Sequence, residues 1–123
     1  YGSTEKGIEQ IKTLFTTAGV DPDAISIIDG SGLSPQNRVT TNAITAILQY
    51  ARRREWFPSF YAALPEFNGM KMKSGYISGV RSFCGYHQSK KGVQYSYSII
   101  VNNFTGSSAE ITKKIYKLLD YLK

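Results

Sequence analysis

The stretch VRSFCGYHQSKKGVQYSYSIIV, residues 80–101, decides the fold of this 123-residue chain. Its two halves, residues 80–87 and 93–101, are rich in β-branched and aromatic side chains. They flank Gln88-Ser89-Lys90-Lys91-Gly92, which has the composition of a hairpin loop. From Val93 to Val101 apolar and polar side chains alternate, which is the period of a half-buried strand. The stretch therefore predicts an antiparallel β-hairpin, with a further short extended run at residues 70–74.

Segments whose apolar residues have helical spacing lie before and after this β region. A first helix begins at Ser3 or Thr4 and ends before Gly19, a second begins at Thr40 or Thr41, and a last one runs from about Ser108 to the end. We expect an α+β fold in which helices pack on an antiparallel β-meander, with residues 1–123 in one domain.

Composition excludes several classes of protein. Apolar residues make up 41% and charged residues 20% of the chain, which argues against intrinsic disorder. The longest apolar runs span only a few residues, so we expect no transmembrane segment, and the chain does not open with a secretory signal pattern. One cysteine, Cys84, excludes an internal disulfide framework. No pair of residues has metal-ligand spacing, so no metal or other cofactor is expected.

The net charge of +6 is concentrated in the second half of the chain. Residues 1–62 carry six charges of each sign, whereas residues 63–123 carry nine Lys and Arg against three acidic residues. A basic half suggests an anionic partner, and the competing interpretation is a solvated surface that keeps the protein soluble. His87, the one histidine, and Cys84 are interpreted as structural residues of strands.

The triplet Lys73-Ser74-Gly75 carries more chemical information than either. It ends an extended run and directly precedes the hairpin. A Lys-Ser/Thr-Gly triplet on an edge strand is a working part of the serine penicillin-recognising enzymes. Its lysine places a positive charge in the cleft, its hydroxyl can bind a substrate carboxylate, and its glycine lets a ligand backbone lie close to the strand.

A second motif stands earlier in the chain, DGSGLSxxN over Asp29–Asn37. Together with Lys73-Ser74-Gly75, Gly79-Val80 and Gly85-Tyr86, it resembles the C-terminal part of the low-molecular-mass penicillin-binding proteins of the D-Ala-D-Ala carboxypeptidase/endopeptidase type. The likeness runs from about residue 1 to the end of the hairpin.

The resemblance implies a serine-type hydrolase of the periplasm or cell envelope. Such an enzyme cleaves peptidoglycan stem peptides that end in D-Ala-D-Ala, works through an acyl-enzyme, and is acylated by β-lactams. The resemblance also implies the site residues. Lys73 would be catalytic, and the substrate-binding residues would be Ser74, Gly75, Tyr76, Leu33 and Ser34.

Two further motifs of that family are not found in their expected form. The chain contains no Ser-x-Asn, and its one Ser-x-x-Lys is Ser3-Thr4-Glu5-Lys6, where Ser3 is expected to cap a helix. We therefore expect a C-terminal portion that is inactive by itself and whose partner is the remainder of the same catalytic domain.

Three departures from the family pattern bear on the substrate pocket. Ser74 replaces the more frequent threonine, and Tyr76 stands where a small hydroxyl residue is common. Pro35 stands where a basic residue is frequent, and Arg38 is the nearby cation that could compensate. The segment Leu64–Lys73 is also short, which predicts a trimmed rim of the cleft.

Two other functions are compatible with the sequence. A nucleic-acid-binding module would use the basic second half with Tyr76, Tyr86, Tyr95 and Tyr97 as stacking platforms. Tyr95 and Tyr97 fall in the core-facing set of their strand, however, so no specific nucleic-acid binding is expected. A non-catalytic interaction module is the remaining alternative.

Overall fold

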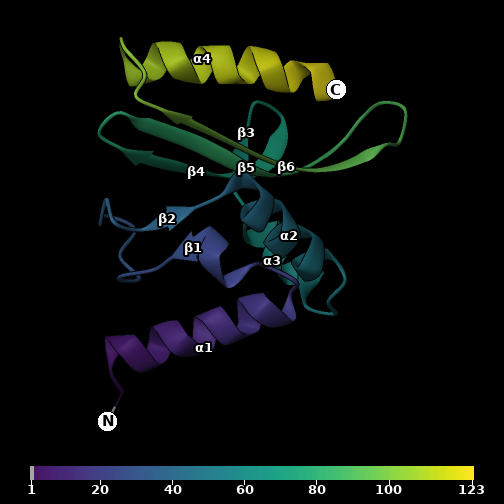
Figure 1. Cartoon of the computed structure of the whole chain (residues 1–123). Helices are drawn as coiled ribbons and strands as arrows, with labels where there is room; N and C mark the ends of the chain where they lie inside the picture. The colour runs from purple at the N-terminus through teal and green to yellow at the C-terminus, as the bar shows by residue number, and fades with distance from the viewer. Residues whose placement is uncertain (1) are drawn as a thin grey trace.

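The computed structural model describes residues 2–123 as an α+β fold, and Figure 1 shows its elements. The chain begins with a helix, forms a small two-stranded ribbon and two helices, then a four-stranded sheet and a closing helix. In order these are α1 (Thr4–Thr17), the 3₁₀ turn η1 (Pro22–Ala24), β1 (Ile25–Ser26), β2 (Arg38–Val39), α2 (Thr41–Arg52), α3 (Phe57–Ala63), β3 (Glu66–Phe67), β4 (Met70–Ile77), β5 (Val80–Gln88), β6 (Gln94–Asn102), α4 (Ser108–Leu119) and the 3₁₀ turn η2 (Asp120–Leu122).

The main sheet has the order β3-β4-β5-β6, and every neighbouring pair is antiparallel. The predicted hairpin is confirmed, because β5 and β6 pair from Val80 opposite Asn102 to Gln88 opposite Gln94. The extended run at residues 70–74 is the first part of the longer strand β4. The meander therefore folds from consecutive strands joined by short turns.

Helices cover both faces of this sheet (Figure 1). In this view α4 lies above the sheet, while α2 and α3 lie below it with the β1–β2 ribbon. Helix α1 lies furthest below, beneath that ribbon. The loop between β1 and β2, which is the DGSGLSxxN segment, lies on the same side of the sheet as α2 and α3 (Figure 1). The second motif, Lys73-Ser74-Gly75, lies within strand β4 of the sheet itself.

The register of the strands decides which side chains face α4. Gly85 of β5 lies opposite Met72 of β4 on one side and Tyr97 of β6 on the other. Successive side chains of a strand alternate between faces, so the odd-numbered residues of β5 and β6 share this face with the even-numbered residues of β4. Together with α4 they build the main core, whose buried members are Met70, Met72, Phe83, Tyr97, Ile115 and Leu119.

The opposite face is anchored to the helices by Tyr86. Its hydroxyl donates a 2.6 Å hydrogen bond to the carbonyl oxygen of Leu48 in α2, and its ring meets the Phe57 ring of α3 edge to face, with centroids 5.1 Å apart. Edge-to-face contacts of buried rings add stabilisation beyond the area they bury. Burial raises the pKa of the Tyr86 hydroxyl to about 12, so this donor stays protonated.

The predicted helix starts are confirmed by their capping bonds. Ser3 accepts from the backbone N–H of Lys6, Thr40 accepts from Ala43, and Ser107 forms a reciprocal capping box with Glu110. The apolar segment Phe57–Leu64 is largely a short helix, which Pro58 helps to start. In the apolar run Ile25–Ile28 only the first two residues pair with β2.

A second, smaller core lies between the end of α1, the ribbon and α2. Its buried residues are Val20, Ile25 and Ala43. Helix α1 itself has no buried residue. Within residues 2–123 no helix has the length and apolar character needed to cross a bilayer.

Gly85 gives a direct test of the strand register. A Cβ at this position would lie 2.1 Å from the carbonyl oxygen of Lys71 and 2.6 Å from the Cα of Met72. Because both atoms belong to backbone, Gly85→Ala must displace β4, and we expect a loss of about 2–4 kcal/mol in the free energy of unfolding. The matched control is Gly7→Ala in α1, where nothing lies within 4 Å and the change should stabilise by up to about 1 kcal/mol. Denaturant unfolding measures both variants, and equal stabilities would contradict the register.

Candidate functional site

The outer edge of β4 is only partly paired. Strand β3 pairs with Met70 and Lys71, and the N–H of Met72 donates to the carbonyl oxygen of Pro65 at 2.9 Å. From residue 73 to residue 77 no other strand of residues 2–123 pairs with this edge. The triplet Lys73-Ser74-Gly75 therefore lies where β4 becomes a free edge, and a free edge can accept an extended peptide as an additional strand.

Lys73 brings an exposed cation to this edge. Its Nζ donates a 3.0 Å hydrogen bond to the carbonyl oxygen of Ser74. By register it lies opposite Cys84, on the face that α2 also contacts. Burial raises the pKa of the Cys84 thiol, and the positive charge of Lys73 partly offsets this effect. Cys84 is therefore held as a neutral thiol beside the lysine.

The alternation of β4 divides the predicted residues between the two faces. Lys73 and Gly75 point to the side of the β1–β2 loop, whereas Ser74 and Tyr76 point to the side of α4. Ser74 is half-buried, and Tyr76 is 57% exposed. Gly75 lies directly opposite Ser82, whose Oγ would be 2.5 Å from a Cβ at Gly75. The glycine thus leaves the room that the Ser82 hydroxyl occupies.

The DGSGLSxxN loop is held together by its own polar side chains. Asn37 Oδ1 accepts from the backbone N–H of Ile28 at 2.7 Å, and Asn37 Nδ2 donates to Asp29 Oδ1 at 3.1 Å. The same Asp29 oxygen accepts from the N–H and the hydroxyl of Ser31, at 3.0 and 2.8 Å. Ser34 closes the last turn, because its carbonyl oxygen accepts from the N–H of Asn37 at 3.1 Å. The first and last residues of the motif are thus its structural clasp.

These bonds also set the ionisation of Asp29. Hydrogen bonds from Ser31, and then from Asn37, hold the pKa of the Asp29 carboxyl below its ordinary value. A carboxyl with a lowered folded-state pKa stabilises the fold above its unfolded pKa, and this contribution is lost as the pH falls through the folded pKa. The loop is therefore most stable with Asp29 ionised.

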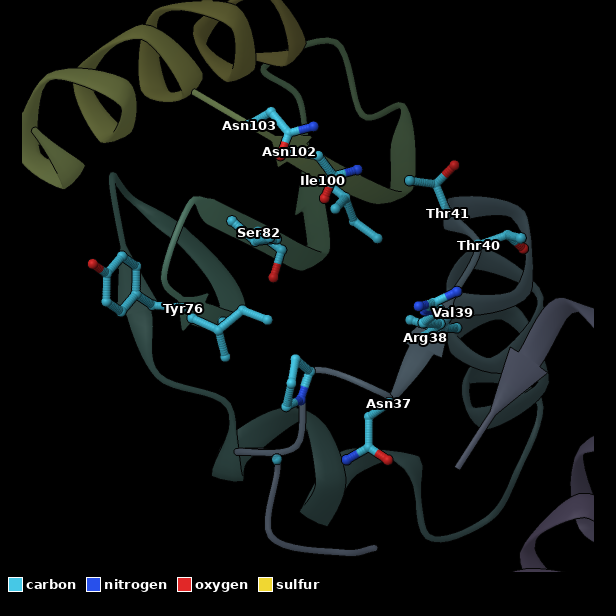
Figure 2. A pocket seen from close by; sticks show the side chains of 15 residues that line it. Asn37, Arg38, Val39, Thr40, Thr41, Tyr76, Ser82, Ile100, Asn102 and Asn103 are labelled. Atoms are coloured by element: carbon cyan, nitrogen blue, oxygen red, sulfur yellow. The ribbon is translucent and has the colours of Figure 1, made fainter. Parts of the chain in front are cut away.

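An open hollow of about 960 Å³ lies between this loop and the sheet (Figure 2). One side is formed by the loop and the start of α2, including Pro35, Asn37 and Arg38. The other side is formed by the ends of β4, β5 and β6. Figure 2 shows the Ser82 hydroxyl directed into the hollow from the sheet, with the Arg38 side chain on the opposite side. Residues on its sheet side include Gly75, Tyr76, Ile77, Ser82, Ile100 and Asn102.

The hollow brings together only some of the residues predicted from the sequence. Gly75 and Tyr76 line it, whereas Lys73 and Ser74, which precede them in β4, do not. Leu33 and Ser34 do not line it: Leu33 is 77% exposed, and Ser34 serves the turn of the loop. Prediction from sequence missed Ser82 and Asn102, although the two-residue period of the strands places both on the face of Gly75.

The other chemically active side chains lie elsewhere or form no cluster. His87 stands at the end of β5 beyond the Lys71–Tyr86 pair, and desolvation together with the charge of Lys123 lowers its pKa. Arg38 has no carboxylate within ion-pair distance among residues 2–123. Over the same range no three His, Cys, Asp or Glu side chains gather as a set that could hold a metal ion.

Comparison with known proteins identifies relatives of this chain. The sequence profile of the D-Ala-D-Ala carboxypeptidase 3 (S13) family matches residues 1–66, more than half of the chain. The D-alanyl-D-alanine carboxypeptidase of Actinomadura sp. (strain R39) is 27% identical over 126 residues, which cover 85% of this chain and 23% of that protein. The chain thus spans about a quarter of the length of this relative.

Solved structures confirm the fold expected from the sequence. Penicillin binding protein 4 from Haemophilus influenzae superposes with a TM-score of 0.83 at 19% identity, over 98% of this chain and 32% of that one. The same protein in complex with a novel β-lactam gives a TM-score of 0.82 at 19% identity, over 98% and 33%. The family match ends before Lys73.

The clasp of the loop predicts a pH-dependent effect of Asn37→Asp. At neutral pH the new carboxylate faces the Asp29 carboxylate where an amide N–H now donates, so we expect the free energy of unfolding to fall below that of the wild type. Acidification should reduce the difference from wild type, because protonating either carboxyl removes the repulsion. Thermal unfolding across a pH series measures this.

The control is Asn42→Asp, the same chemical change in the exposed first turn of α2, where a negative charge suits the helix dipole. It should be neutral or slightly stabilising at neutral pH. Equal effects of the two substitutions would show that Asn37 does not clasp the loop.

Proposed function

Because the chain belongs to the D-Ala-D-Ala carboxypeptidase 3 (S13) family, we propose that it forms the C-terminal portion of the catalytic domain of a serine-type D-Ala-D-Ala carboxypeptidase/endopeptidase. In this proposal residues 1–123 supply the edge strand of the cleft, and the remainder of the same domain supplies the nucleophile. The substrates are peptidoglycan stem peptides, the inhibitors are β-lactams, and the place of action is the periplasm or cell envelope.

The observation that carries this proposal is the position of Lys73-Ser74-Gly75 on the free edge of β4 beside the hollow. A stem peptide in an extended conformation can add to this edge through backbone hydrogen bonds. Gly75 offers no side chain that would push the peptide away. The loop that Asp29 and Asn37 clasp would form the facing side of the cleft.

Lys73 would supply the charge of the site. The stem peptide ends in a carboxylate, and attack on its last peptide bond develops negative charge on the carbonyl oxygen. A fixed cation at the edge attracts both the terminal carboxylate and the negative charge on the carbonyl oxygen. This electrostatic effect is greatest where water is excluded from the site. Ser74 points to the α4 side of β4, so its hydroxyl would reach the carboxylate only across the free edge of the strand, where it would add one neutral hydrogen bond.

The nucleophile of this reaction would come from outside the 123 residues. Ser3, in the one Ser-x-x-Lys sequence, accepts the 3.2 Å capping bond from Lys6 and does not line the hollow. Helix α1, which it begins, lies in the outermost layer of the fold (Figure 1). Ser3 is therefore engaged in helix capping away from Lys73.

Incubation of the 123-residue chain with a labelled penicillin tests this assignment. We expect intact-mass spectrometry to show no covalent adduct, because Ser3, the serine of the one Ser-x-x-Lys sequence, caps α1 and does not line the hollow. A stoichiometric adduct, on Ser3 above all, would contradict the assignment of the nucleophile to the rest of the domain.

Substitutions in the longer enzyme test the role of the triplet. Lys73→Ala should slow acylation by a β-lactam by about 100-fold, because it removes an electrostatic contact that acts in the transition state. Its melting temperature should change little, since an exposed lysine contributes little to folding. Ser74→Ala should be milder, as it removes a neutral hydrogen bond worth about 1 kcal/mol, and Ser74→Thr should be nearly silent.

The matched control is Lys91→Ala, which removes an equally exposed lysine from the β5–β6 loop. It should acylate at the wild-type rate. The triplet would have no catalytic role if Lys73→Ala behaved like Lys91→Ala, or if its loss of activity only followed a loss of folding.

A further inference from the structure

Arg81 of β5 is a half-buried cation that three contacts hold on the α4 side of the sheet. Its Nε donates a 3.1 Å hydrogen bond to the hydroxyl oxygen of Thr112 in α4, and its Nη1 donates to the carbonyl oxygen of Gly75 at 3.5 Å. The guanidinium carbon lies 4.6 Å from the centroid of the Phe83 ring. The Thr112 hydroxyl is itself oriented, because it donates to the carbonyl oxygen of Ser108 at 2.7 Å. These contacts fix the position of the guanidinium.

The positive charge of Arg81 has no acidic partner in the part of the chain that the structure describes. Within residues 2–123 no carboxylate lies within ion-pair distance of it. A guanidinium has five N–H donors, and over the same residues the bonds to Thr112 and Gly75 engage only two of them. Charges that are taken out of water are usually paired with an opposite charge. An anion that reaches this place would therefore meet a positioned cation with free donors.

The strand register places this charge beside Ser74. Arg81 lies opposite Tyr76, and Phe83 lies opposite Ser74. All four side chains are on the α4 side, because side chains two residues apart on a strand share a face. Since the guanidinium lies over the Phe83 ring, the Arg81 side chain leans from the Tyr76 position toward Ser74. The Ser74 hydroxyl and the Arg81 guanidinium therefore border the same part of β4.

The backbone of β4 is open to an extended peptide at this point. The N–H of Met72 donates to Pro65, on the side of β4 away from β5. Alternation turns the backbone N–H and C=O groups of Ser74 and Tyr76 to the same side. A peptide strand added there would lie about 4.8 Å from β4. Its terminal carboxylate, turned toward α4, would come within reach of both the Ser74 hydroxyl and the Arg81 guanidinium.

We propose that Arg81 is a substrate-binding residue, which takes the terminal carboxylate of the stem peptide on the α4 side of the edge together with Ser74. This role rests on the proposed function and gives the two cations near the edge separate tasks. Lys73, on the other face, would act on the carbonyl group that is attacked, whereas Arg81 would hold the carboxylate. A planar guanidinium can bind a carboxylate through two parallel N–H···O bonds. The site would therefore select peptides with a free terminal carboxylate.

Hydrolysis of two peptides by the longer enzyme tests this role. One peptide ends in D-Ala-D-Ala with a free carboxylate, and the other is its terminal carboxamide. We expect the wild type to prefer the free carboxylate. Arg81→Gln should lower kcat/KM for this peptide about 10- to 100-fold and leave the carboxamide nearly unchanged, because it removes hydrogen bonds between two charged groups. Arg81→Lys keeps the positive charge and should retain part of the preference.

The matched control is Arg53→Gln, the same chemical change on an exposed arginine at the end of α2. This variant should hydrolyse both peptides at wild-type rates. If Arg81→Gln slows both peptides equally, Arg81 only supports the packing of α4 on the sheet, and the proposal is overturned. A wild-type enzyme that cleaves neither peptide would contradict the proposed function itself, and the role of Arg81 with it.

Discussion

The antiparallel register of β4, β5 and β6 is the constraint on which the rest of the structure depends. It sets Met72, Gly85 and Tyr97 side by side, and the absence of a side chain at Gly85 lets β4 approach closely enough for the pairing. A slip of one residue would turn Met72 away from α4 and move Lys73 to the other face. The core under α4 and the chemistry at the free edge are thus fixed by the same set of hydrogen bonds, so a substitution in the core can alter the site without touching it.

Local signals in the sequence predicted the elements well. Ser3, Thr40 and Ser107 each carry a short polar side chain just before a helical apolar pattern, and all three cap their helices. The same kind of reasoning predicted the hairpin, because alternation and loop chemistry are properties of neighbouring residues. It did not predict α3 as a helix, since residues 57–63 form only two turns whose stability comes from packing against Tyr86.

The site was harder to predict because its members meet through the fold. Lys73-Ser74-Gly75 was found as a motif, but the hollow beside it combines the β1–β2 loop with the far ends of three strands. Ser82 was missed because a serine in mid-strand carries no local signal, and only pairing with Gly75 directs its hydroxyl into the hollow. Asn37 shows the reverse case: a residue selected as part of a functional motif proves to organise backbone, and this explains why the motif needs an amide at that spacing from Asp29.

The two separate buried clusters have a consequence for the order in which the molecule loses structure. The larger cluster joins the sheet to α4 through six buried side chains, whereas the smaller one has three and includes none from α1. Segments with few buried contacts open at a lower free energy than the core and exchange their amide protons first. Helix α1 and the ribbon therefore form a unit that detaches early, and the meander with α4 remains as the last folded body. Proteases should therefore cleave first within α1 and the ribbon.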